Sequence, residues 1–138
     1  VPAPSAPLPH LHQGVAVVGP RAVQRVRAGP TDPVDTPHLP HGMDAGLLID
    51  PSTQTLFAGD LFAQPGADGP AITEGDIFGP SEAMRQAFPY APITNAGALL
   101  AKLASTEATT LACMHGSSYR GDGGALLREL ARAIGGDA

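Results

Sequence analysis

The chain has 138 residues, enough for one compact domain, and 43% of them are apolar, although only 4% are aromatic. A net charge of −5 with only eight Lys and Arg argues against electrostatic nucleic-acid binding, and a single cysteine excludes a disulfide framework or a Cys-rich zinc module. No apolar run approaches the ~18 residues of a membrane-spanning helix, and the first residues lack the pattern of a secretory signal. The sequence therefore predicts a soluble, cytoplasmic protein without a nucleic-acid or membrane partner.

The first 34 residues are rich in proline, a composition that favours extended backbone without regular pairing. Nine of the fifteen prolines lie within residues 1–40. The apolar run 14–18 is typical of a short strand, whereas residues 21–27, with three Arg, fit either a helical turn or a solvated edge. We therefore predict a mostly irregular segment over residues 1–34 and a globular domain over residues 35–138.

Two buried strands and a long loop follow. Residues 46–50 (GLLID) form the first predicted strand, and residues 55–58 return from it after a turn. The second strand ends at Gly59-Asp60, so that the Asp60 carboxylate stands at a strand terminus. Residues 64–80 contain four Gly and three Pro, which predicts a long loop of the kind that is often functional.

The rest of the chain predicts three helices and one more strand. The first helix covers residues 80–88 with Pro80 in its first position, and the second begins at a capping Asn95 and runs to about residue 104. A buried strand over residues 109–114 and a loop over 116–121 precede the last helix, which Asp122 caps and Gly135 ends. This order predicts an α/β fold.

Three ionisable side chains lie next to the ends of predicted strands. His38 lies just before a strand, whereas Asp60 and His115 each follow the end of one. Ligand crevices form at the carboxyl ends of strands, and imidazole and carboxylate suit Zn(II), Fe(II) and Mn(II). The alternative is ordinary loop chemistry, in which Asp60 caps a turn and each histidine hydrogen-bonds the backbone near it.

The same residues carry a family resemblance. Residues 36–62 resemble the second half of a metallo-β-lactamase-fold domain, above all the oxygen-binding di-iron branch related to flavodiiron proteins. Three elements match in order: a His-x-Pro-x-Gly-Met segment, a hairpin that ends in Gly-Asp followed by two bulky apolar residues, and a later strand that ends in Met-His-Gly. The matching residues are His38, Pro40, Gly42, Met43, Gly59, Asp60, Leu61, Phe62, Met114, His115 and Gly116. The resemblance covers roughly residues 35–135.

The resemblance implies the second half of an αββα sandwich, a mixed sheet with helices on one face, and a dinuclear zinc or iron site. His38 and His115 would each bind one metal and Asp60 would bridge the two, so their metal-facing atoms should lie within roughly 8 Å of one another. His41 stands where the family often has an acidic residue, and it ranks as a secondary ligand. The H-x-[HED]-x-D-H signature of the first half is absent from the sequence, and His10 and His12 form only an isolated H-x-H pair.

Because that signature is missing, the resemblance implies a truncated metal-dependent hydrolase that acts weakly or not at all on an unidentified small-molecule substrate. One alternative is a fragment of a di-iron domain that binds or reduces oxygen. Another is a non-catalytic remnant or interaction module. A half sandwich would leave sheet residues such as Leu48 and Phe57 less covered than usual, which predicts a homo-oligomer through the uncovered sheet.

Overall fold

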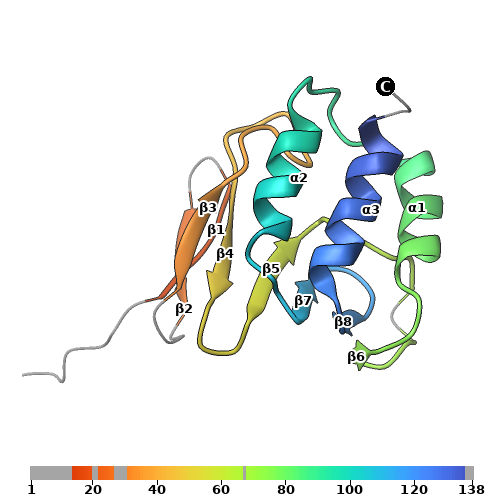
Figure 1. Ribbon diagram of the computed structural model, residues 1–138, viewed down its shortest axis with the longest axis horizontal. Coiled ribbons are helices and arrows are strands. Elements are labelled where there is room, and N and C mark those ends of the chain that lie inside the picture. Colours follow the sequence, from red (N-terminus) through yellow and green to blue (C-terminus); the bar gives the residue numbers. More distant parts are fainter. Residues whose placement is uncertain (1–13, 20–21, 27–30, 67, 136–138) are drawn as a thin grey trace, which may run out of the picture.

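The computed structural model describes residues 14–19, 22–26, 31–66 and 68–135. In these residues a six-stranded mixed sheet packs against three helices, and a two-stranded hairpin lies beside it (Figure 1). The sheet contains β3 (Asp32–Asp35), β4 (Gly46–Asp50), β5 (Thr55–Gly59), β6 (Ile72–Thr73), β7 (Thr110–Cys113) and β8 (Ser118–Arg120). The helices are α1 (Phe78–Ala87), α2 (Ala96–Ala104) and α3 (Gly123–Gly135). The predicted α/β class, a mixed sheet with helices, is confirmed.

The sheet order is β3-β4-β5-β7-β8-β6. Strands β3, β4 and β5 are antiparallel neighbours, but β5 and β7 run parallel, with Thr55 opposite Thr110. The connection between β5 and β7 carries α1 and α2, as a parallel pair requires a long crossover. Because parallel neighbours end at the same edge of a sheet, the residues that follow β5 and β7 come together there.

The core forms between one face of the sheet and the helices, which stand side by side in Figure 1. Alternate residues of β4 and β5 point into it, in keeping with the two-residue period of a strand. Burial of each large aliphatic side chain contributes about 1.5–3 kcal/mol. The buried residues of this core include Leu47, Ile49, Leu56, Ala58 and Leu111 from the sheet and Leu100, Leu103, Leu127 and Leu130 from the helices.

The opposite face of the sheet differs from the sequence prediction. Leu48 is only 7% exposed, so the prediction that it is poorly covered is wrong. Phe57, its cross-strand neighbour, is half-buried.

The capping side chains predicted for the helices are found at only some of the helix starts. Asp122 accepts a hydrogen bond from the Ala125 N–H at 2.7 Å and caps α3 as predicted. Helix α1 begins two residues earlier than predicted, because the Asp76 carboxylate accepts the N–H groups of Phe78 and Gly79. Asn95 precedes α2 but its side chain makes no capping hydrogen bond, so the predicted cap is wrong.

Two short strands, β6 and β8, lie in segments for which the sequence predicts loops. β8 occupies the 116–121 loop and pairs with β7, while β6 lies in the 64–80 loop and pairs with β8. Strands of two or three residues are too short to show an apolar period, so the sequence gives no signal for them.

The N-terminal segment also holds more regular structure than predicted. Within residues 1–34, predicted to be mostly irregular, the structure describes an antiparallel hairpin of β1 (Gly14–Gly19) and β2 (Ala22–Val26), and the start of β3. The strand predicted over residues 14–18 is confirmed, and β2 replaces the helical turn considered for residues 21–27. Pro33 is tolerated in β3 because that strand lies at the edge of the sheet. His10 and His12 lie outside the described residues.

Candidate metal centre

Asp60 is placed by an irregularity at the end of β5. The parallel register between β5 and β7 shifts between Phe57 and Gly59, so that Gly59 lies opposite Cys113. Gly59 takes a positive φ of 56°, a backbone conformation that glycine adopts without steric cost, and its carbonyl accepts the N–H of Met114 at 2.9 Å. Bulges of this kind re-aim a side chain next to a functional site. Here the carboxylate of the next residue leaves the sheet at the edge where β7 also ends.

Two histidines approach the Asp60 carboxylate, one at each oxygen. His41 Nε2 lies 2.8 Å from Oδ2, a hydrogen-bond distance at which the imidazole N–H donates. His115 Nε2 lies 3.3 Å from Oδ1, within ion-pair range but without hydrogen-bond alignment. Oδ1 is shielded from solvent, and among the described residues it has no hydrogen-bond partner. The side chains of His41, His115 and Asp60 are 52%, 58% and 31% exposed. The carboxylate is thus shared between two imidazoles that solvent can reach.

The β3–β4 loop carries both His38 and His41. His38 has a positive φ of 67°, which is uncommon for a side-chain-bearing residue, and its N–H donates to the carbonyl of Met43 at 2.9 Å. The Pro40 carbonyl accepts the N–H of Ala91 at 2.8 Å, which ties the loop to the segment after α1. The tight turn directs His41 to Asp60. His38 is exposed, and among the described residues its side chain makes no hydrogen bond or ion pair with Asp60 or His115.

His115 follows β7 in a loop that packs against the loop after β5. Its carbonyl accepts the N–H of Gln64 at 3.2 Å, and Gly116, with a φ of 81°, lets the chain turn directly after it. A Cβ atom at Gly116 would lie 2.6 Å from the Gln64 Cβ, so the two loops approach as closely as a glycine allows. The structure therefore brings together Asp60, His115 and the secondary candidate His41.

Tyr90 holds the turn that follows Asp60, a role for which the sequence carries no motif. Its hydroxyl accepts the N–H of Phe62 at 3.3 Å and donates to the carbonyl of Asp60 at 3.4 Å. Phe62 is fully buried with a positive φ of 60°, so this turn is an unusual one for a bulky residue. Burial raises the pKa of Tyr90 to about 12, and the phenol stays protonated and able to donate throughout the physiological range.

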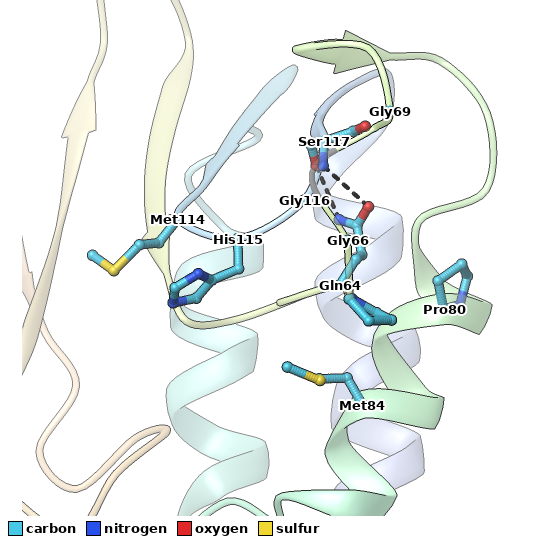
Figure 2. A pocket seen from close by; sticks show the side chains of 10 residues that line it. Gln64, Gly66, Gly69, Pro80, Met84, Met114, His115, Gly116 and Ser117 are labelled. Atoms are coloured by element: carbon cyan, nitrogen blue, oxygen red, sulfur yellow. Dashed lines mark hydrogen bonds between the residues drawn. The ribbon is translucent and has the colours of Figure 1, made fainter.

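Two cavities open beside His115, and the smaller one reaches the Asp60 carboxylate. A small one of about 180 Å³ is lined by both histidines and Asp60 together with Met84, Arg85, Phe88 and Tyr90, among others. A larger open one of about 670 Å³ is also lined by His115, together with Gln64, Met84, Met114 and Ser117, among others (Figure 2). Arg85, which faces the small cavity, is paired with Glu82, and this hydrogen bond raises the pKa of the guanidinium.

The side chains around Asp60 are of the types that bind metal ions, but they are too few for a complete coordination shell. A buried carboxylate oxygen without a partner is costly, and a cation between it and His115 would satisfy it. Carboxylate and imidazole are ligands of iron and zinc. In the described part of the chain, however, no group of three or more His, Cys, Asp or Glu side chains is arranged to hold one ion. These residues could thus supply a share of each metal's ligands, not a complete set.

The fold is similar to that of a di-iron protein. A structure of the apo state of the chemotaxis sensor ODP from T. denticola matches with a TM-score of 0.59 and 16% identity, over 86% of this chain and 48% of that one. A structure of the peroxy diiron species of chemotaxis sensor ODP matches with a TM-score of 0.58 and 15% identity, over 89% and 50%. The chain thus spans about half the length of these structures. No family model and no curated protein matches the sequence.

Among the described residues, none of the helices has the length and apolar character needed to cross a membrane.

Proposed function

We propose that this chain is the second half of a metallo-β-lactamase-fold domain of the di-iron type, and that Asp60 bridges its two metals. The observation that supports the proposal most is the Asp60 carboxylate between two imidazoles, with Oδ2 on His41 and Oδ1 near His115. A bridging carboxylate offsets the repulsion between two cations ~3.5–4 Å apart. In this arrangement each metal would take one oxygen of Asp60 and one histidine.

Two histidines of the β3–β4 loop, His38 and His41, are candidates for the metal ligand on the Oδ2 side of Asp60. The family resemblance implies His38, whereas the contact distance favours His41, which already reaches the carboxylate. We propose His41 as the ligand in this chain, with His38 three residues away as its competitor. His115 fills the other position in both versions.

Iron is favoured over zinc because the similar fold belongs to a protein described with a diiron species. When bound, a pair of irons would supply redox chemistry toward a small ligand. The metal-dependent hydrolase predicted from the sequence, and zinc with it, gain no support from these comparisons. The chain's own residues would hold the ions through Asp60 and the two histidines, while Met84 and Phe88 keep part of the small cavity apolar.

Metal binding by this chain should be weak. One histidine and half of a carboxylate per metal falls short of the three protein ligands that an ordinary catalytic zinc site uses. Water would fill the remaining positions. We therefore expect ions to bind in the presence of free metal and to leave on dialysis against a weak chelator.

The test is anaerobic titration of the metal-free chain with Fe(II), and separately with Zn(II), followed by isothermal calorimetry. Asp60→Asn keeps the size of the side chain and removes the charge that would bridge two cations, so we expect Fe(II) affinity to fall at least about tenfold. Asp44→Asn is the matched control, because Asp44 is an exposed carboxylate in the loop that carries His41. Equal Fe(II) affinity in the wild type and in Asp60→Asn would refute the proposal.

A further inference from the structure

Gln64 joins the loop that carries Asp60 to the loop that carries His115. Its side-chain amide donates to the carbonyl of Phe62 at 3.0 Å and to the carbonyl of Ser117 at 2.9 Å. Its side-chain oxygen accepts the N–H of Ser117 at 3.2 Å, and its own backbone N–H donates to the carbonyl of His115. Figure 2 shows the side chain reaching across to Ser117. Both amide hydrogens of the side chain are therefore used, one on each loop.

The surroundings of Gln64 leave little room for other arrangements. Ser117 is itself buried and its hydroxyl donates to the carbonyl of Pro70 at 2.6 Å, which fixes the far side of the contact. Gly116 lies so close that an added Cβ would meet Gln64 at 2.6 Å. The amide is held at both ends, as a rigid link between two loops would be.

We propose that Gln64 is a positioning residue that sets the separation between Asp60 and His115, an inference that rests on the proposed metal site. Asp60 and His115 are themselves 31% and 58% exposed, so their own packing fixes their positions only in part. Gln64 binds the backbone two residues after each of them, at Phe62 and at Ser117. The link thus acts on the backbone of both candidate ligands without touching a metal.

The expected effect follows from the small range of metal–ligand distances that a metal site tolerates. Ligand distances in metal sites hold to within about 0.2 Å, so a small relative movement of the two loops would pull one ligand out of range. Loss of a residue that orients metal ligands typically lowers metal affinity by about 10–100-fold. We expect a loss of that size when the link is removed.

Two substitutions in the full chain separate hydrogen bonding from space filling. Gln64→Ala removes the link. Gln64→Glu keeps the size and the acceptor for the Ser117 N–H, but it loses both donors and sets a carboxylate against two carbonyl oxygens. Gln54→Ala is the matched control, since Gln54 also bonds a backbone carbonyl, that of Pro51, in the turn at the other end of β5.

Three measurements are made on each variant: Co(II) affinity from the visible absorption of the bound ion, hydrogen exchange of the Ser117 amide without metal, and thermal unfolding. We expect both Gln64 variants to bind Co(II) about 10–100-fold more weakly than the wild type, and Gln54→Ala to bind it equally well. We expect Ser117 exchange to rise at least about tenfold in Gln64→Ala. Unchanged Co(II) affinity in either Gln64 variant overturns the inference and leaves the proposed function standing.

If the wild-type chain takes up no Co(II), the proposed function fails, and Ser117 exchange alone then decides whether Gln64 links the loops. Faster exchange in Gln64→Ala supports the link, and unchanged exchange overturns it. Gln64 is only half-buried, so folded variants are expected. Loss of folding in both variants would show that Gln64 serves the whole fold, which overturns a role confined to the site.

Discussion

Substitution of Tyr90 by Phe tests how the turn after Asp60 is held. The change deletes one hydroxyl, which accepts the Phe62 N–H at 3.3 Å and donates to the Asp60 carbonyl at 3.4 Å. Phe62 is fully buried, and its N–H would lose this partner. An orphaned buried polar group costs about 1–3 kcal/mol, and both contacts are long, so we expect a loss of about 1–2 kcal/mol of the free energy of unfolding.

Urea unfolding followed by circular dichroism measures this loss. The midpoint should fall without a change in slope, because the substitution alters stability and not the surface exposed on unfolding. For a chain of this length, 1 kcal/mol corresponds to roughly 3–5 °C in Tm, so scanning calorimetry should show a drop of about 3–10 °C.

Tyr119→Phe is the control for loss of a phenolic hydroxyl. Tyr119 is also half-buried, and its hydroxyl makes no hydrogen bond with any described residue. Its substitution should change stability by less than about 0.5 kcal/mol. Equal losses in the two variants would refute the argument, because the hydroxyl of Tyr90 would then hold nothing that the hydroxyl of Tyr119 does not.

Three further outcomes are expected. Gly116→Ala should lose about 1–3 kcal/mol more than Gly66→Ala in urea unfolding, because both glycines have positive φ but only Gly116 lies against Gln64; equal losses would contradict the close approach. His41→Ala should weaken Fe(II) binding more than His38→Ala in calorimetry, and the reverse order would assign the ligand to His38. Burial raises the pKa of the Cys113 thiol to about 11, above its value in the unfolded chain, so stability should fall by about 2 kcal/mol between about pH 9 and pH 11. Cys113→Ala should reduce that fall. The same dependence of stability on pH in Cys113→Ala and in the wild type would contradict the role of the Cys113 thiol.

Much of the fold follows from local sequence. The strand 46–50 was predicted with the bounds it has, because an apolar run of five residues between turn signals has few alternatives. The last helix also agrees, since Leu127 and Leu130 lie on its buried face and Asp122 caps it. β6 pairs with β8, which lies far from it in the sequence, and strands of two or three residues carry no apolar period that would mark them.

Some residues of the candidate site could likewise be predicted from the sequence, and others could not. Asp60 and His115 could be expected at one edge because each follows a strand, and the parallel pairing of β5 with β7 brings these ends together. Which histidine of the β3–β4 loop reaches Asp60 depends on a turn with a positive φ at His38, which sequence spacing does not encode. Tyr90 and Gln64 act on backbone atoms, so no motif could single them out. That these residues bind metal stays a prediction.

The two outer strands of the sheet bear on how copies of this chain behave at high concentration. β3 contains Pro33, which has no N–H to offer, and it begins and ends with the exposed residues Asp32 and Asp35. β6, at the other end, is only two residues long. Proline, charge and brevity are the devices by which natural sheets avoid growing into fibres. The edges of the six-stranded sheet should therefore resist edge-to-edge polymerisation.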